Sequence, residues 1–146
     1  MEKAVIVDID GTLANCEHRR HFILKMPKDW KSFHVGCGQD TVNGWCRTIV
    51  LQFKRIGYKI LLVSGRIAEN RTVTMDWLYL NNIPHDRLLM RKPNDFRDDQ
   101  IVKREIYEDE IKGKYEVLFA VDDRKRIVEM WREVGLVCLQ CAEGDF

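Results

Sequence analysis

Short apolar runs alternate along this chain with longer segments in which apolar residues recur every three or four positions. Apolar runs that end at small or charged residues are typical of buried strands. We therefore predict strands at the apolar opening of residues 4–13 and at Tyr58–Val63, Arg87–Met90, Tyr115–Val121 and Leu136–Leu139.

The segments between these runs predict helices. In Val42–Ile56 the apolar residues follow helical spacing, and Gly57 suits the position just past a helix end. Further helices are predicted at Ala68–Leu80, at Asp99–Ile111 and around Ile127–Val134. We expect the aromatic residues of these helices to pack in the core, namely Trp45, Phe53, Trp77 and Trp131.

This alternation predicts a compact Rossmann-like α/β domain over residues 1–146. The strands are too continuously apolar to have a face exposed to water, so we expect a parallel sheet covered by helices on both sides. Residues 15–39 depart from the pattern, because two short helical pieces flank Lys25–Lys28 and the following run lacks regular structure. We expect this segment to be a small cap-like insert that covers a site.

The insert also mixes cations with aromatic rings, among them Arg19, Arg20, Phe22 and Trp30. Such a mixture suits base stacking together with attraction of phosphate groups. A solvated helix face with its aromatic residues turned inward would have the same sequence. A substrate role for Arg19 and Arg20 is therefore one of two open interpretations.

Composition narrows the class of protein. The chain has 146 residues, 45% hydrophobic and 32% charged, and a formal net charge of +1, which excludes a disordered chain and a general coat for nucleic acid. It contains no apolar run long enough to span a bilayer and no signal peptide, so we expect a cytoplasmic protein. Five cysteines, an odd number, favour reduced thiols.

The first apolar run ends on Asp8 and Asp10, followed by Gly11. Two aspartates at this spacing can converge on one centre if the chain leaves the strand between or just after them, which Gly11 permits. Adjacent carboxylates repel each other unless a cation separates them, and oxygen ligands favour Mg²⁺. Two solvated aspartates in a turn are the simpler alternative.

Other strands end on residues suited to phosphate chemistry. Ser64-Gly65-Arg66 closes the second run, Asp122-Asp123 closes a later one, and Lys103 lies early in a predicted helix. Ligands of open parallel sheets bind beyond the carboxyl ends of the strands, where these groups would fall. We therefore expect them to form one site.

The order of these motifs resembles the haloacid dehalogenase (HAD) superfamily of phosphotransferases: DxDGT, then a serine after a strand, a lysine, and a final DD pair. Val63–Arg66, Asp98–Ile106, Val121–Arg124 and Gly144–Phe146 look like the phosphatase domain of bacteriophage polynucleotide kinase/phosphatase. The resemblance implies a three-layer HAD fold with a central parallel sheet and a small insert after the first strand.

By this resemblance, Asp8 attacks phosphorus and forms a phosphoaspartate. Asp10 protonates the leaving oxygen and then activates water, for which an adjacent carboxylate and partial burial would raise its pKa. Mg²⁺ would be bound by Asp8, by the backbone carbonyl of Asp10, and by Asp122 or Asp123, of which we favour Asp123.

The same resemblance implies a clamp on the transferring phosphoryl group, made by Ser64, the amide of Gly65 and Lys103. Thr12 would brace the loop. Arg66 and Arg91 match positions near the phosphate, but either can instead be a structural partner of nearby aspartates, because the guanidinium fork fits both anions.

The expected activity is removal of a phosphate monoester, most simply the 3'-phosphate at a polynucleotide end. The chain contains no G-x-x-x-x-G-K-[ST] loop, so any kinase or ligase step would need a separate partner. A nucleotidase or other small-molecule HAD phosphatase is the alternative enzyme. A receiver-like signalling domain is the alternative of a different class, although a receiver places its paired acids first in the chain.

Overall fold

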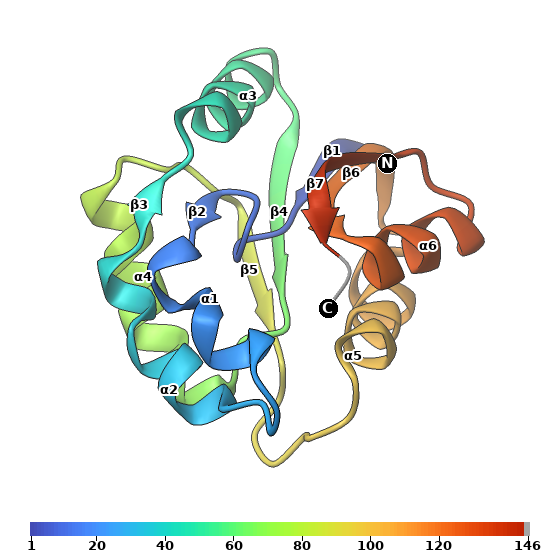
Figure 1. Cartoon of the computed structure of the whole chain (residues 1–146). Helices are drawn as coiled ribbons and strands as arrows, with labels where there is room; N and C mark the ends of the chain where they lie inside the picture. The colour runs from blue at the N-terminus through green and yellow to red at the C-terminus, as the bar shows by residue number, and fades with distance from the viewer. Residues whose placement is uncertain (145–146) are drawn as a thin grey trace.

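The computed structural model describes residues 1–144, so Asp145 and Phe146 of the terminal motif lie outside the described residues. Its centre is a five-stranded sheet in the order β5-β4-β1-β6-β7, with every neighbouring pair parallel (Figure 1). The strands are β1 (Glu2–Val7), β4 (Lys59–Ser64), β5 (Arg87–Met90), β6 (Tyr115–Arg124) and β7 (Cys138–Gly144). A parallel α/β sheet is therefore confirmed.

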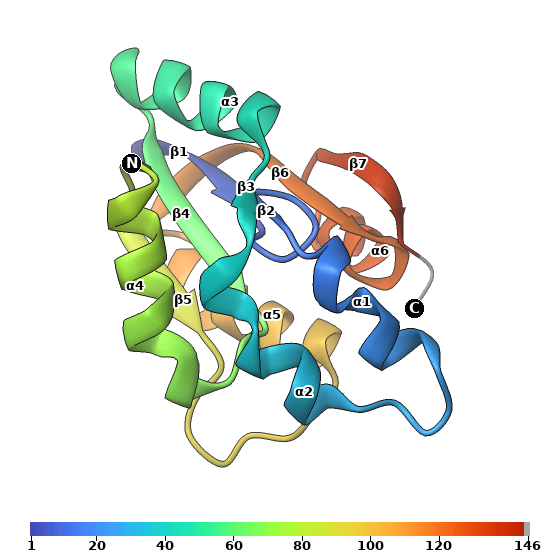
Figure 2. The same cartoon turned by 60° about the vertical axis from the view of Figure 1, so that its left-hand side comes forward.

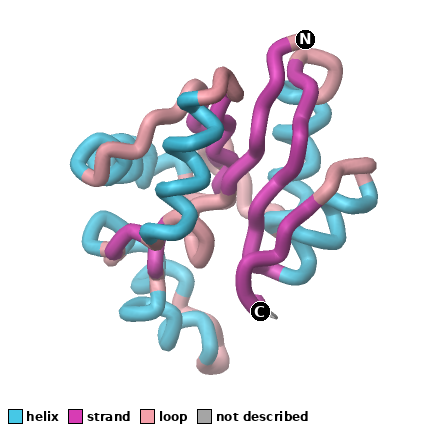
Figure 3. Tube along the Cα trace, turned by 90° about the horizontal axis from the view of Figure 1, so that it is seen from above, coloured by secondary structure: helices cyan, strands magenta, loops and turns pink. Residues whose placement is uncertain are grey.

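Helices cover both faces of this sheet (Figure 3). Helices α3 (Gly44–Arg55) and α4 (Arg71–Leu80) pack on one face, and α5 (Asp99–Ile106) and α6 (Lys125–Glu133) pack on the other. A 3-10 turn, η2 (Ala68–Asn70), precedes α4, and a π-helical turn, η3 (Tyr107–Ile111), continues α5. The three-layer arrangement follows from strands whose two faces are both apolar.

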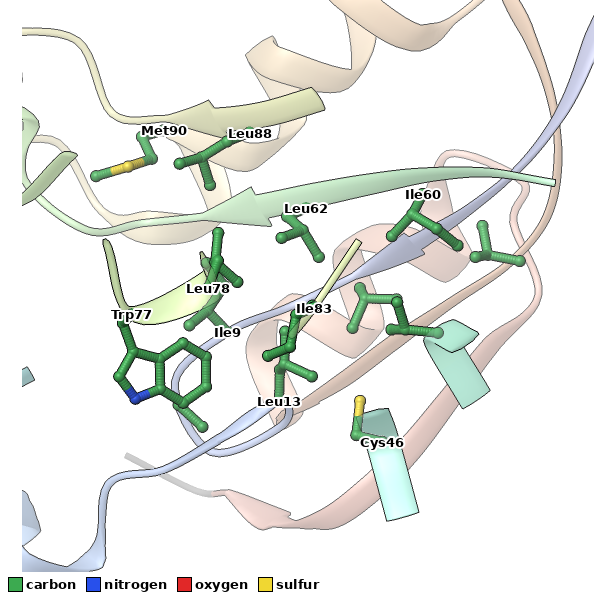
Figure 4. Packing of buried hydrophobic residues seen from close by; sticks show 14 residues of the cluster. Ile9, Leu13, Cys46, Ile60, Leu62, Trp77, Leu78, Ile83, Leu88 and Met90 are labelled. Carbon is green, nitrogen blue, oxygen red and sulfur yellow. The ribbon is translucent and has the colours of Figure 1, made fainter. Parts of the chain in front are cut away.

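Side chains of the central strands point alternately to the two faces of the sheet, so the hydrophobic core consists of two clusters, one on each face. Val5 and Val7 of β1 face α3 and α4, whereas Ala4 and Ile6 face α6 and η3. Figure 4 shows the first of these clusters, with Leu62 of β4 among its labelled side chains. Because each strand is apolar on both sides, only its carboxyl end is left for polar chemistry.

Among the predicted core aromatics, Trp77 and Trp131 are buried and Phe53 packs partly buried against the first cluster. Trp45 is an exception to the prediction, because 46% of it is exposed. It lies at the start of α3 beside the buried Cys46, so helical spacing placed its neighbour, rather than the tryptophan, against the sheet.

The insert after β1 forms a small unit of its own. It contains β2 (Ala14–Asn15), α1 (Glu17–Leu24), α2 (Trp30–Val35) and η1 (Cys37–Gln39), and β3 (Thr41–Val42) pairs antiparallel with β2 to return the chain to the sheet. Both predicted helical pieces are thus present. Figure 2 shows α1 and α2 beside the carboxyl end of β4.

None of the helices within residues 1–144 combines the length and the apolar character that a bilayer crossing requires.

Candidate active site

Side chains from the ends of two parallel strands and from one helix meet at the carboxyl edge of the sheet. Asp8 follows β1, Asp122 lies near the end of β6, and Lys103 lies on α5; all three are buried. The Lys103 Nζ donates to Asp8 Oδ1 at 2.7 Å and to Asp122 Oδ2 at 2.9 Å. Residues separated by 95 positions in the chain are thus joined, as the strand-end motifs predicted.

Asp8, Asp122 and Asp123 form what we call the carboxylate cluster. One oxygen from each lies within 4.8 Å of the others, a spacing suited to a shared metal ion. Asp122 is already engaged, because its oxygens accept from Lys103, the Trp131 indole and backbone amides. Asp123 Oδ2 is buried, and no described residue gives it a hydrogen bond. This orphaned oxygen fits a cation.

The electrostatics of the cluster also fit a cation. Burial, followed by the charge of Asp122, raises the pKa of Asp8 well above its usual range even though Lys103 opposes the shift. Burial and Asp122 likewise raise the pKa of Asp123 to about 6. Three carboxylates face the Lys103 ammonium group, with the Arg20 guanidinium 3.7 Å from Asp123 Oδ2, so a divalent ion would compensate the remaining negative charge.

The Asp10 side chain lies outside the carboxylate cluster, in what we call the arginine network: Asp10, Asp40, Arg19 and Arg66. Asp10 Oδ1 accepts from Arg19 Nη2 at 2.6 Å and from Arg66 Nη2 at 2.7 Å. Arg19 also donates to both oxygens of Asp40, at 2.8 and 2.6 Å. The negative charge of Asp10 is therefore balanced by two guanidinium groups, so its side chain does not need the metal ion that the spacing of Asp8 and Asp10 predicted.

The expected rise in the pKa of Asp10 is wrong as well. Burial alone would raise it, but Arg66 and Arg19 together outweigh burial and hold the pKa of Asp10 below its usual range. The same pairing raises the pKa of Arg66 despite its burial. In this structure the two arginines therefore favour the carboxylate form of Asp10.

The loop after β1 approaches the cluster closely because of Gly11. Its φ is +82°, and a Cβ there would collide with the Asp123 carboxylate, so both the backbone conformation and the close approach require glycine. Thr12 Oγ1 donates to Asp8 Oδ2 at 2.8 Å, which agrees with its expected bracing role. Asp8 is consequently held through both of its oxygens.

Ser64 and Gly65 end β4 and line the cleft described below. The Arg66 amide donates to Ser64 Oγ at 3.1 Å, which orients the hydroxyl. A Cβ on Gly65 would collide with the Asp99 carboxylate, so this position also needs glycine for a close approach. Both groups stand at the edge where the clamp was expected.

The other predicted arginines have structural partners. Arg91 is buried, and its Nε donates to the Gly65 carbonyl at 2.9 Å. Arg20 pairs with Glu17 at 3.0 Å and lies 3.7 Å from Asp123. Arg19, buried in the arginine network, and Arg20, beside Asp123, thus point into the protein, whereas Lys25, Lys28 and Lys31 of the insert are exposed.

Two acidic residues of the site were not among the predicted ones. Asp40 completes the arginine network by accepting hydrogen bonds from Arg19. Its position just before β3 was the one feature of the sequence that could have indicated it. Asp99 accepts from Arg91 and from Arg124, the latter at 2.9 Å. Its position one helical turn before Lys103 was a signal that could have revealed it.

Many of these groups line one cleft of about 470 Å³. Its floor holds Asp8, Asp122 and Asp123, and its walls include Arg66 and, from the insert, Trp30. The volume suits a small ligand or the end of a larger one. Buried acids and a hydroxyl that line such a cleft, with Lys103 bonded to Asp8, can support transfer of a phosphoryl group to Asp8.

Known proteins resemble the chain over its whole length. The solved Pnkp1/Rnl/Hen1 RNA repair complex contains a chain that matches 100% of this one with a TM-score of 0.89 at 39% identity, while this chain covers 44% of it. A relative from Autographa californica nuclear polyhedrosis virus, named "Putative bifunctional polynucleotide kinase/RNA ligase", is 28% identical over 137 residues, which is 92% of this chain and 18% of the relative. The chain thus spans less than half of each.

A more distant structure shows the fold alone. D,D-heptose 1,7-bisphosphate phosphatase from B. bronchiseptica, complexed with magnesium and phosphate, is 14% identical, with a TM-score of 0.60 over 96% of this chain and 80% of its own.

The family comparison covers residues 2–146 and so includes the insert as well as every strand-end motif. This family match agrees with the order of the acidic motifs in the chain, DxD first and DD last, which argued against a receiver domain. The chain belongs to the HAD-type phosphatase domain family of polynucleotide kinase PNKP.

Proposed function

We propose that this chain is a Mg²⁺-dependent phosphoric monoester hydrolase that removes the 3'-phosphate from polynucleotide ends. The observation that carries the proposal is the carboxylate cluster, where buried Asp8 is held by Thr12 and Lys103 beside the orphaned Asp123 Oδ2. No structural need of the fold explains three buried carboxylates facing a cleft. Membership of the phosphatase family supports the same chemistry.

In the first step, an Asp8 carboxylate oxygen attacks phosphorus and the bond from phosphorus to the 3'-oxygen breaks. Asp10, which the arginines hold as a carboxylate in the free protein, takes up a proton as the phosphate of the substrate binds and passes it to the departing oxygen, which leaves as the 3'-hydroxyl. Lys103, Ser64 and the Gly65 amide would balance charge on the phosphoryl oxygens. The product is a phosphoaspartate on Asp8.

In the second step, Asp10 accepts a proton from water and the water oxygen attacks the phosphoaspartate. The bond from phosphorus to Asp8 then breaks, so inorganic phosphate leaves and the Asp8 carboxylate is restored. Arg19 and Arg66 support this step, because they keep Asp10 as a carboxylate aimed by fixed hydrogen bonds. The arginine network thus acts as the positioning frame for the proton-transfer group.

Asp8 and Asp123, with the backbone carbonyl of Asp10, would hold Mg²⁺, and Asp122 would support the site through Lys103. When bound, the ion screens the repulsion between an anionic nucleophile and an anionic phosphate. The buried, mutually repelling carboxylates and the orphaned oxygen support this assignment.

The polynucleotide substrate is supported by the two relatives whose names refer to polynucleotide kinase and RNA repair. The solved relative occurs together with Rnl and Hen1. We propose that this chain works in end repair with a separate kinase or ligase activity, and that residues 15–39 form a cap-like insert within a single domain of residues 1–146.

The test is release of phosphate from an oligonucleotide bearing a 3'-phosphate, compared with a free 3'-nucleotide and a free 5'-nucleotide, each with Mg²⁺ and with a chelator. We expect the oligonucleotide to have the highest kcat/KM and the chelator to abolish turnover. Equal rates on the free nucleotides would instead identify a nucleotidase. Turnover that survives chelation would contradict the metal assignment.

A further inference from the structure

Phe96 is the unusual side chain of the cleft. It lies in the loop between β5 and α5, is 88% exposed, and lines the same cleft as Asp8. A single exposed apolar residue is ordinary on a protein surface. The surroundings of Phe96 are what distinguish it.

The Arg91 guanidinium fixes the backbone on both sides of Phe96. Arg91 Nη1 donates to the carbonyl of Asp95 at 3.1 Å and to the carbonyl of Arg97 at 2.6 Å, the residues immediately before and after the phenylalanine. The same guanidinium is tied to the Gly65 carbonyl at the end of β4. The backbone that carries the exposed ring is therefore fixed relative to the catalytic edge.

A second aromatic side chain lines the cleft from the insert. Trp30 of α2 is 37% exposed, and its ring packs on Phe33 at 5.7 Å and stacks on His34 at 6.0 Å between ring centroids. Figures 1 and 2 place α2 and the loop after β5 at the same end of the molecule. The cleft thus has an aromatic residue on the insert side and another on the loop side.

The charge beside Phe96 is already balanced. Arg97 pairs with Asp95 at 2.7 Å and with Glu105 at 2.8 Å. A ligand that reaches this side of the cleft therefore meets a neutral ring face next to a compensated cation. Such a surface suits the flat face of a nucleobase better than a phosphate group, which would favour an unpaired cation.

We propose that Phe96 stacks on the nucleobase of the nucleotide that carries the scissile phosphate, with Trp30 on the opposite wall. This inference rests on the proposed function and names the part of the polynucleotide that the cleft recognises. It makes Phe96 a specificity-determining residue, since the ring touches the base and not the reacting atoms.

The test compares Phe96→Ala with wild-type protein on two substrates: an oligonucleotide with a 3'-phosphate, and the same oligonucleotide with an abasic terminal nucleotide. Stacking of a base on an aromatic side chain contributes ~1–3 kcal/mol, which corresponds to about a 5- to 150-fold loss of kcat/KM on the first substrate. We expect the loss mainly in KM, little loss on the abasic substrate, and wild-type activity in Phe96→Trp.

Tyr79→Ala is the matched control, because Tyr79 is also a highly exposed aromatic residue, 83% exposed, and does not line the cleft. Equal losses of Phe96→Ala on the two substrates, no loss at all, or full activity in Phe96→Leu would each overturn stacking. If wild-type protein released no phosphate from any oligonucleotide, the proposed function would fail and the stacking proposal with it.

Discussion

The carboxylate cluster and the arginine network start from Asp8 and Asp10, which are two residues apart in the chain, but the buried negative charge is balanced differently in the two groups. In the arginine network, two guanidinium groups balance two carboxylates. In the carboxylate cluster, three carboxylates face Lys103 and the more distant Arg20, 3.7 Å from Asp123, and Asp123 keeps an oxygen without a hydrogen-bond partner among the described residues. The first group is electrostatically complete, whereas the second leaves room for a cation.

This difference separates two tasks. A complete network can hold a side chain in one orientation, because every donor and acceptor has a partner. An incomplete cluster stores unfavourable repulsion that a metal ion or a phosphoryl group can relieve. Asp8 and Asp10 therefore have different chemistry although they share one motif.

The largest expected effect comes from the nucleophile. Asp8→Asn keeps the shape of the side chain but replaces the attacking carboxylate with an amide, so we expect phosphate release to fall by about 10⁴-fold or more. The measurement is the rate of phosphate release from a 3'-phosphorylated oligonucleotide. A loss smaller than tenfold would show that Asp8 is not the group that takes the phosphoryl.

The second effect tests the completeness of the arginine network. Arg19→Met leaves the buried Asp40 carboxylate without its bidentate partner, and breaking a buried pair costs ~3–5 kcal/mol of unfolding free energy. Urea unfolding followed by circular dichroism measures this loss. The double variant Arg19→Met/Asp40→Asn should recover part of it.

A matched control for this variant is Arg104→Met, which removes an exposed pair with Glu133. Exposed pairs contribute little, so the control should unfold close to wild type. Similar unfolding curves for Arg19→Met and Arg104→Met would contradict the structural importance of the network.

The third effect distinguishes the two regions by metal binding. Mg²⁺ at about 100 times its Kd should stabilise wild-type protein by ~2.7 kcal/mol, seen as a rise in Tm. Asp123→Asn should lose this rise, because it removes a carboxylate of the cluster. Asp10→Asn should keep it, since the Asp10 side chain is bound by arginines instead. An equal change in Tm on addition of Mg²⁺ to the two variants would contradict the difference between the carboxylate cluster and the arginine network.

The sheet and its polar edge were readable from the sequence. The apolar runs before Asp8, Ser64 and Asp122 determine where strands end, and parallel strands bring their carboxyl ends together. Lys103 could be placed near them through its helix. The contacts among Asp8, Lys103 and Asp122 confirm this part of the prediction.

The partners of Asp10 could not be predicted in this way. Arg19 and Asp40 lie in the insert, whose short elements follow no periodic pattern, and their pairing depends on how α1 folds back on the chain. The sequence at Asp8-Ile9-Asp10 therefore predicted two similar carboxylates. Only the three-dimensional contacts show that one is neutralised by arginines and the other lies among further acids.

The most direct test of the central claim is transfer of the phosphoryl group to Asp8. Rapid acid quenching after mixing the protein with Mg²⁺ and an oligonucleotide carrying a radiolabelled 3'-phosphate should give labelled protein, and peptide mapping should place the label on Asp8. The label should be absent from Asp8→Asn. Turnover of the oligonucleotide without labelled protein at any quench time, or with the label on another residue, would contradict the account.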